Sequence, residues 1–405
     1  MRRVRTIAIL CEERFQEADG AIFSSNGFGR DYWRRYAEIF GSLVVVARIE
    51  PVGRPAGAAE PLAGAPVALR PLPAFRGPAR LLPRLPAVMR ALGRATRGVD
   101  GFIVRWPGTL TLLALPFLLA ARKPIAIEVV GDSRAMFESG VGGLASGLLA
   151  HLAQAAGRRL FDAASAVTYV TDRKLQARYP APAGATQAAF SDVILADGEL
   201  RPDPRPAADF RHAPRARLLF AGTMEQGYKG IDVLIAAAAR LAAGGLDFEL
   251  RIAGAGRLEP VVRAQAEALG LGRRVTMLGR IPKVDLLAEM DRCDLFLVPS
   301  LTEGLPRGVV EAMARAAPVI ASDVGGIPEL LPQDCLVAPG DAAALAAAIA
   351  ERVADPERLA AMSADNLRAA GRFTEAATAG ARREFYRAFR AQVETAAASR
   401  EPCAD

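Results

Sequence analysis

The most informative stretch of the sequence runs from Asp294 to Glu329, because it contains the signals of strand, loop, helix and strand in close succession. The apolar run Leu295–Val298 is too short for an ordinary helix and is ended by a Pro-Ser pair, so it predicts a buried strand. Pro306 suits the first turn of a helix, where its missing N–H has no partner to lose. Pro318 then opens a second predicted strand. This is one unit of a parallel sheet, and parallel sheets bind ligands beyond the carboxyl ends of their strands.

Two glutamates make this unit a candidate binding site. Glu303 lies in the loop after the first strand, and Glu311 lies eight positions later, early in the helix. Both side chains are expected to face one crevice. The amides at the helix start offer a site for an anion such as a diphosphate, and Arg307 adds a cation there. Such a pocket suits a nucleotide sugar. The alternative for the glutamate pair alone is an acidic loop plus one solvated side chain.

The pattern around these glutamates resembles that of the GT-B glycosyltransferases, in particular the group often called family 4 or group 1. Their hallmark is a glutamate, seven residues and a second glutamate. The segments of this chain that match are Pro299-Ser300, Glu303 to Pro306, Glu311 to Ala314, Pro318 to Ala321, Gly325-Gly326, Phe220 to Gly222 and Lys229 to Ile235. The resemblance is strong over residues 216–345 and weaker before them.

The resemblance implies transfer of a sugar from a nucleoside diphosphate to an acceptor hydroxyl, with retention at the anomeric carbon. It assigns the ribose hydroxyls to Glu311, the sugar hydroxyls to Glu303, and the diphosphate to Lys229 and the helix start. The expected donor-binding residues are Glu311, Gly304, Leu305, Pro306, Arg307, Gly222, Gly254 and Gly256.

Lys229 follows a loop after a strand and precedes a helix, so its ammonium could reach a diphosphate at the neighbouring helix start. Relatives commonly carry a basic residue just after the glycine at position 222. This chain has Thr223 and Met224 there, which leaves Arg307 as the candidate substitute. No Asp-x-Asp pair occurs in the chain, so we expect no metal and no other cofactor. Cations and the helix dipole would then stabilise the leaving diphosphate directly. A surface lysine is the alternative.

The pair Gly254 and Gly256 follows a predicted strand, but Glu259 occupies the position of the third glycine in a dinucleotide fingerprint. This argues against an NAD enzyme. The pair either lets a nucleotide approach the backbone closely or makes an ordinary tight turn.

The N-terminal half alternates predicted strands, at 4–11, 43–48, 102–104, 125–130 and 166–171, with helices such as 30–40, which favours a doubly wound sheet. The loop with Asn26, Gly27 and Gly29 is similar in position to the GT-B loop between acceptor and donor phosphate, although a surface turn explains it equally well. Many relatives place a histidine after the strand at 125–130, and this chain has none there. Glu128 and Asp132 are the candidates for the base that accepts the acceptor's proton. Asp132 could instead cap the following segment.

The length of 405 residues predicts about two domains, because single cores rarely exceed about 250–300 residues. Residues 197–215 are rich in proline and charge and are interpreted as a linker. The expected fold class is α/β of the GT-B type, with two Rossmann-like domains facing each other across a cleft. Residues 1–196 would bind the acceptor and residues 216–374 the nucleotide sugar. A helix at 375–398 would pack within the second domain or return to the first.

The net charge of +7 and the pI near 9.6 suggest an anionic partner. The segment from Arg70 to Arg97 carries seven arginines, including Arg76, and no acidic residue, interleaved with leucines. It could lie on an anionic membrane surface, where each cation contributes about 1 kcal/mol. A solvated arginine-rich face is the alternative. Nucleic acid ranks last, since Phe75 is the one aromatic residue available for stacking.

Cys11, Cys293, Cys335 and Cys403 lack metal-ligand spacing, and no signal peptide precedes the first predicted strand. We therefore expect a cytoplasmic protein, in part peripheral at the inner membrane face. The apolar run 110–121 is shorter than the roughly 20 residues of a spanning helix. A lipid-linked or saccharide acceptor in surface polysaccharide or glycolipid synthesis follows from these expectations. Two alternatives remain open: a GT-B nucleotide-sugar epimerase and a non-catalytic nucleotide-sugar-binding partner of a transferase.

Overall fold

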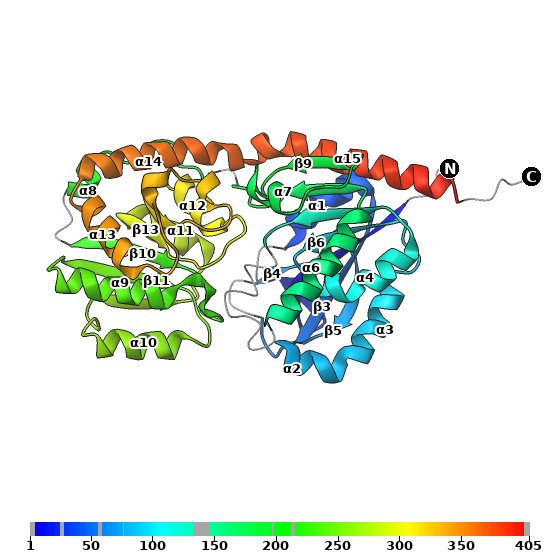
Figure 1. Ribbon diagram of the computed structural model, residues 1–405, viewed down its shortest axis with the longest axis horizontal. Coiled ribbons are helices and arrows are strands. Elements are labelled where there is room, and N and C mark those ends of the chain that lie inside the picture. The colour runs from blue at the N-terminus through cyan, green and yellow to red at the C-terminus, as the bar shows by residue number, and fades with distance from the viewer. Residues whose placement is uncertain are drawn as a thin grey trace, which may run out of the picture. The chain divides into compact units, whose positions relative to one another are not determined.

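The computed structural model describes residues 5–24, 28–55, 59–75, 77–132, 146–196, 198–211 and 215–400. These residues form two compact α/β units (Figure 1). Unit 1 is drawn from residues 1–133, 150–190 and 380–405, and unit 2 contains residues 191–379. No helix within the described ranges combines the length and apolarity needed to cross a membrane.

Unit 1 is built on a parallel sheet with the strand order β5-β3-β1-β6-β7-β8-β9. The central strands are continuous apolar runs because helices cover both of their faces. Their bounds are β1 Thr6–Ala18, β3 Ser42–Pro51, β5 Ala68–Pro73, β6 Gly101–Trp106, β7 Ile125–Val129, β8 Ala166–Tyr169 and β9 Thr186–Ala189. The short strands β2 Ala21–Ser24 and β4 Glu60–Pro61 extend the sheet in antiparallel pairing beside the end of β1.

Two hydrophobic clusters lie on the two faces of this sheet. Helices α3, α4 and α6 contribute to one cluster, with Leu92, Leu118 and Phe161 buried in it. Helices α1 and α15 contribute to the other, with Trp33 and Phe389 buried. The helix bounds in unit 1 are α1 Arg30–Phe40, α2 Gly77–Leu81, α3 Leu85–Ala95, α4 Thr109–Ala121, α6 Ser146–Asp162 and α7 Lys174–Arg178, with a 3-10 turn η1 Leu82–Arg84.

Three features of unit 1 differ from the sequence-based expectation. Strand β1 continues past Cys11 and turns at Asp19-Gly20, where both residues have positive φ, to form a hairpin with β2. Strand β5 contains Pro71 and Pro73, which argue against a strand, yet it pairs on one side only and so tolerates them as an edge strand. Strand β9 is half-exposed and carries no apolar alternation.

Unit 2 has the strand order β12-β11-β10-β13-β14-β15, all parallel, which is the order of a dinucleotide-binding fold. The strands are β10 Ala216–Ala221, β11 Phe248–Ala253, β12 Val275–Gly279, β13 Leu295–Val298, β14 Val319–Ser322 and β15 Leu336–Val337. The helices are α8 Ala208–Arg211, α9 Ile231–Ala243, α10 Glu259–Ala268, α11 Lys283–Arg292, α12 Arg307–Ala314, α13 Ala342–Val353 and α14 Pro356–Ala370, with 3-10 turns η4 Gly227–Lys229, η5 Ile327–Glu329, η6 Gln333–Cys335 and η7 Gly371–Phe373.

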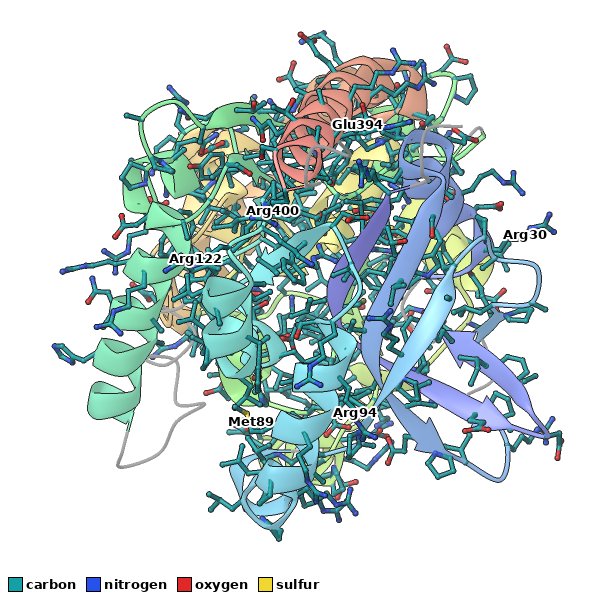
Figure 2. All side chains as sticks on the ribbon, turned by 90° about the vertical axis from the view of Figure 1, so that its right-hand side faces the viewer. Arg30, Met89, Arg94, Arg122, Glu394 and Arg400 are labelled. Atoms are coloured by element: carbon teal, nitrogen blue, oxygen red, sulfur yellow. The ribbon has the colours of Figure 1, made fainter. Side chains whose placement is uncertain are left out.

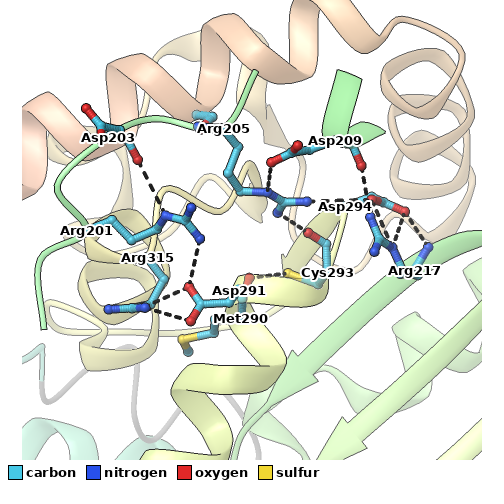
Figure 3. Close-up of polar contacts among 11 residues, drawn as sticks. Arg201, Asp203, Arg205, Asp209, Arg217, Met290, Asp291, Cys293, Asp294 and Arg315 are labelled. Atoms are coloured by element: carbon cyan, nitrogen blue, oxygen red, sulfur yellow. Dashed lines mark hydrogen bonds and ion pairs between the residues drawn. The ribbon is translucent and has the colours of Figure 1, made fainter. Parts of the chain in front are cut away.

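The stretch interpreted as a linker is packed into unit 2 where the structure describes it. Arg205 is 3% exposed, and its guanidinium lies between Asp209 and Asp294, 3.8 and 3.9 Å away (Figure 3). Arg217 donates to the same Asp294 from the start of β10. Phe210 is part of the unit 2 core. A composition rich in proline and charge thus marks irregular backbone here, but the arginines and aspartates satisfy one another against the first residues of β10 and β13.

Helix α15 Glu375–Ala398 begins in unit 2 and continues in unit 1 from Gly380 onward. Phe385, Tyr386, Phe389 and Val393 are each at most 2% exposed and belong to the cluster that α1 covers. One face of the last helix therefore completes the core of the unit that holds the start of the chain.

Candidate functional site

The residues predicted to bind a donor converge at the carboxyl edge of the unit 2 sheet. Strands β10 and β13 are neighbours there, although they are not consecutive in the chain. The loop after β10 carries Lys229, and the loop after β13 carries Glu303. In open α/β sheets a ligand binds at the point where the strand order reverses.

Lys229 and Glu303 form an ion pair, with Nζ 2.6 Å from Oε1. The side chains are 21% and 8% exposed. Ser300, which is fully buried, donates a hydrogen bond from Oγ to the same Oε1 over 2.7 Å. The Lys229 ammonium also lies 5.3 Å from the ring centroid of Tyr228. A cation and a carboxylate thus stand together at the strand edge with their positions set by neighbours.

Two glycines allow the backbones of these loops to come close. Gly230 follows Lys229 with φ +66°, and a Cβ there would lie 1.9 Å from the carbonyl oxygen of Pro299. Gly325 has φ +53°, and a Cβ there would lie 2.0 Å from the carbonyl oxygen of Glu303. Side chains at either position would be strained and would push against the site backbone. The glycines therefore fix the spacing between the lysine loop, the glutamate loop and the loop after β14.

Helix α12 begins at Arg307, with Pro306 in extended conformation as its N-cap residue. Arg307 is exposed at this first turn. Gly304 accepts a hydrogen bond from the Gly326 N–H over 2.7 Å, and Leu305 packs against the unit 2 core. The start of α12 thus follows Glu303 closely in the chain, and its use as an anion site stays a prediction.

Glu311 is 6% exposed and lies on α12 among apolar neighbours. Burial raises its pKa, while the ammonium of Lys283 and the guanidinium of Arg307 act in the opposite direction. Lys283 Nζ lies 3.6 Å from Glu311 Oε1 and 2.5 Å from Glu199 Oε1. A buried carboxylate of this kind can accept hydroxyl groups that enter the site.

The glycines after β10 and β11 pack against each other. A Cβ at Gly254 would lie 1.9 Å from the Gly222 carbonyl oxygen, and one at Gly256 would lie 2.2 Å from the Met224 carbonyl carbon. Met224 is fully buried, so its side chain faces the core. The close approach that these glycines permit is therefore between two protein loops, an alternative that the sequence did not suggest.

The acceptor candidates lie in unit 1. Glu128 on β7 is 6% exposed, accepts hydrogen bonds from the hydroxyls of Tyr36 and Tyr386 over 2.9 and 2.6 Å, and lies 3.6 Å from Arg105 Nε. This geometry favours a role in anchoring α1 and α15. Asp132 is more exposed; Tyr179 donates to it over 2.7 Å.

The glycine loop of unit 1 is described in part. Gly29 packs beside Glu60, whose Oε2 would lie 2.1 Å from a Cβ at that position. Asn26 and Gly27 lie outside the described residues.

Sequence reasoning missed Ser300, Lys283 and Glu199. Ser300 precedes Glu303 within the quoted motif, so its position was a usable signal. Lys283 opens the helix after β12, at the same sheet edge, and could have been found by that register. Glu199 lies in the stretch interpreted as a linker and carried no signal. Within the described ranges, no cluster of three or more His, Cys, Asp or Glu side chains could hold a metal.

Comparisons with known proteins find matches to part or most of the chain. Residues 215–355 match the family model described as glycosyl transferases group 1. Protein CapJ of Staphylococcus aureus is 26% identical over 79% of this chain and 79% of CapJ. The putative colanic acid biosynthesis glycosyltransferase WcaL of Salmonella typhimurium is 39% identical over 30% of this chain and 32% of WcaL, so that match spans about a third of the relative.

Solved structures match over nearly the whole chain. Sucrose-phosphate synthase from Thermosynechococcus elongatus has a TM-score of 0.71 at 20% identity, covering 96% of this chain and 99% of that one. HepE of Anabaena in complex with UDP-glucose has a TM-score of 0.61 at 17% identity, covering 97% and 99%. These likenesses confirm the predicted GT-B fold. Residues 215–355 thus form a group 1 glycosyltransferase domain, within a chain that has the GT-B fold.

Proposed function

We propose that the protein transfers a sugar from a nucleoside diphosphate to an acceptor hydroxyl, with retention at the anomeric carbon. The observation that carries this proposal is the Lys229–Glu303 pair, 2.6 Å apart beside the start of α12. On donor binding, Lys229, Arg307 and the α12 amides neutralise the diphosphate, and Glu303 orients the sugar hydroxyls. Glu311 accepts the ribose hydroxyls. Stabilisation of the leaving diphosphate by fixed positive charge needs no metal.

In the reaction, the bond from the anomeric carbon to the diphosphate oxygen breaks and a bond to the acceptor oxygen forms. The acceptor proton passes to a base in unit 1. Both carboxylates have partners, because Tyr179 donates to Asp132 and Arg178 Nε lies 3.5 Å from it, while two tyrosines donate to Glu128. Asp132 is the better candidate because its side chain is 28% exposed, whereas that of Glu128 is 8% exposed.

We further propose a saccharide or lipid-linked acceptor in surface polysaccharide or glycolipid synthesis. The names of two relatives support this: WcaL is a colanic acid biosynthesis glycosyltransferase, and AmsK of Erwinia amylovora is an amylovoran biosynthesis glycosyltransferase. The neighbouring structure of HepE contains UDP-glucose, which makes a uridine nucleotide the first donor to test.

The basic segment supports a membrane-surface acceptor. Arg80, Arg84, Arg90, Arg94 and Arg97 are exposed on or beside α2, η1 and α3, and Leu82 between them is 69% exposed. Figure 2 labels Arg94 and Met89 on this side of unit 1. Arg70 is engaged elsewhere: its guanidinium donates to the Ala95 and Arg97 carbonyls at the end of α3. Arg76 lies outside the described residues. We propose that this face rests on anionic lipid at the inner membrane surface.

The membrane proposal is tested by sedimentation with phosphatidylglycerol and phosphatidylcholine vesicles. Binding to the anionic vesicles alone is expected, and the triple variant Arg80→Ser, Arg90→Ser, Arg94→Ser should lose most of it. The control removes three exposed unit 2 arginines, Arg263→Ser, Arg292→Ser and Arg368→Ser, and should bind as the unaltered protein does. Equal loss in both variants would show that net charge alone is responsible.

The function itself is tested first by thermal stabilisation with UDP, GDP, ADP, dTDP and CDP, because a ligand held only by the native state raises the melting temperature. Stabilisation by one of these should vanish in Glu311→Ala. Glu303→Ala and Lys229→Ala should each reduce transfer at least about tenfold, the effect of losing about 1.4 kcal/mol of transition-state stabilisation. Arg368→Ala, at an exposed position of α14, is the control. Full activity in both site variants would reject the site.

Two outcomes would favour the alternative functions that the sequence left open. Turnover of a nucleotide sugar without any acceptor would indicate an epimerase. Nucleotide binding without turnover would indicate a non-catalytic partner.

A further inference from the structure

Lys283 occupies a place in the unit 2 site that the proposed reaction does not yet use. It is the first residue of α11, directly after the N-cap residue Pro282, at the sheet edge where β12 ends. Its ammonium lies 2.5 Å from Glu199 Oε1 and 3.6 Å from Glu311 Oε1. One cation therefore stands between two carboxylates that come from distant parts of the chain.

The two carboxylates are not ordinary surface partners. The Glu311 side chain is 8% exposed and that of Glu199 is 14% exposed, while the lysine is half-exposed at 48%. Glu199 is held in place by its backbone carbonyl, which accepts from Arg315 over 3.1 Å, and Arg315 is in turn paired with Asp291 (Figure 3). Its other carboxylate oxygen accepts the Ala196 N–H over 3.2 Å. Glu199 is thus held on both its backbone and its carboxylate, and it fixes one partner of Lys283.

We propose that Lys283 is a positioning residue of the donor site: shared between Glu199 and Glu311, its ammonium keeps the Glu311 carboxylate charged and oriented for the ribose hydroxyls. The proposal rests on the donor role of Glu311 in the proposed function. It assigns Glu199 the opposite effect, because this second carboxylate competes for the same cation.

The electrostatics of the site agree with this arrangement. Burial is the largest influence on Glu311 and raises its pKa, and Glu199 raises it further. Lys283 and Arg307 lower it. These are the charged groups that act on Glu311 from α11, α12 and the segment before β10. A carboxylate that must stay ionised in so buried a place depends on its cation.

Substitutions of Lys283 and of Glu199 should therefore shift the pKa of Glu311 in opposite directions. Lys283→Met removes the cation and should raise the pKa of Glu311, so that nucleotide binding weakens on acidification from a higher pH than in the unaltered protein. Glu199→Gln releases the lysine and should lower the pKa of Glu311, which shifts the loss of binding to lower pH. Lys283→Arg should restore most of the affinity. Arg292→Met, at the other end of α11 and 72% exposed, is the matched control.

Two measurements make the test. Protein labelled with carbon-13 at glutamate carboxyls is titrated by NMR, with Glu311→Gln used to assign the Glu311 signal. In parallel, the affinity for whichever of UDP, GDP, ADP, dTDP or CDP stabilises the protein is measured by calorimetry against pH. Lys283→Met should weaken the affinity at neutral pH about tenfold and raise the donor KM more than it lowers kcat.

The outcomes separate this inference from the proposed function. Opposite titration shifts in Lys283→Met and Glu199→Gln, with affinity following, would support the positioning role. An unmoved Glu311 titration in Lys283→Met would overturn it, even if nucleotide binding and transfer are intact. Expected titration shifts in a protein that binds none of the five nucleotides would overturn the proposed function, and the donor role of Lys283 with it.

Discussion

At the scale of single residues, the site depends on which atoms of each side chain already have a hydrogen-bond partner. Glu303 receives a lysine and a serine hydroxyl on the same oxygen, Oε1. In the proposed function, its second oxygen would accept the sugar hydroxyl. Ser300 matters in this arrangement because a hydrogen bond to a charged acceptor restricts the carboxylate more than a neutral one does.

Ser300→Ala tests this role. The variant should lower kcat about tenfold, in line with the loss of roughly 1.5 kcal/mol for a hydrogen bond to a charged group, with a smaller change in donor KM. Steady-state kinetics at several donor concentrations measure both. Ser363→Ala is the control, since Ser363 is also fully buried but accepts from the Arg205 N–H away from the site. Equal kinetic losses in both variants would point to a general loss of stability.

The described cysteines lead to a second prediction at this scale. Burial raises the pKa of Cys11 and of Cys293 to about 12 and that of Cys335 to about 11. A thiolate forms only above the pKa, so all three remain neutral thiols at pH 8 and should resist iodoacetamide in the native state. Mass spectrometry of the peptides should find them alkylated only after denaturant is added. Rapid native labelling of Cys293 would contradict its burial.

At the scale of elements, the loops at the sheet edge are held by glycines rather than by side chains. Gly230 joins η4 to α9 with φ +66° and passes close to the Pro299 carbonyl. This contact sets how near the lysine loop comes to the glutamate loop. The strands supply a frame, and the glycine contacts fix the spacing of the loops upon it.

A pair of alanine substitutions separates backbone strain from close approach. Gly245, just past the end of α9, also has positive φ, but nothing lies within 4 Å of a Cβ there. Gly245→Ala should cost about 1 kcal/mol of unfolding free energy from strain alone. Gly230→Ala should cost more, about 3 kcal/mol, because atoms must also move, and should weaken nucleotide binding. Denaturant unfolding of both variants measures this; equal costs would show that the Pro299 contact is unimportant.

Much at this scale could be predicted from the sequence. The limits of β13 agree with the expected ones because it is an apolar run ended by a Pro-Ser pair. Edge strands were harder to predict. Strand β5 contains prolines and β9 is half-exposed, and neither pattern indicates a strand. Glu303 and Glu311 were singled out because they lie within one recurrent motif, and Lys229 because it belongs to a matching segment upstream. Lys283 and Glu199 were not, because their meeting depends on tertiary packing that no local pattern encodes.

At the scale of the whole molecule, the two units have similar architecture but are built from different numbers of chain segments. Unit 2 draws its described core from one continuous stretch, 191–379. Unit 1 needs three separate stretches, and the last of them is α15. Tyr386 ties this helix to Glu128 on a central strand, and Arg390 donates to the Ile39 carbonyl on α1.

Loosening α15 should therefore weaken unit 1 selectively. Phe389→Ala removes a fully buried ring and should cost about 3–5 kcal/mol. Hydrogen exchange read by mass spectrometry should show lost protection in β1, β3 and α1, with β10, β11 and β13 unchanged. Glu394→Ala, which removes an exposed pair with Arg390 on the same helix, should leave both units protected. Equal loss of protection in the two units would show that they unfold together.

The position of α15 in the chain also bears on the order of events during synthesis. Domains generally fold as they leave the ribosome, the N-terminal one first. Here α15, which covers one face of the unit 1 sheet together with α1, is translated after every other described element, so unit 2 can bury its core while part of that face still lacks its cover. Until translation reaches Phe385 and Phe389, the nascent protein carries an exposed apolar surface on the domain that is synthesised first. A ribosome-associated chaperone would bind at that surface.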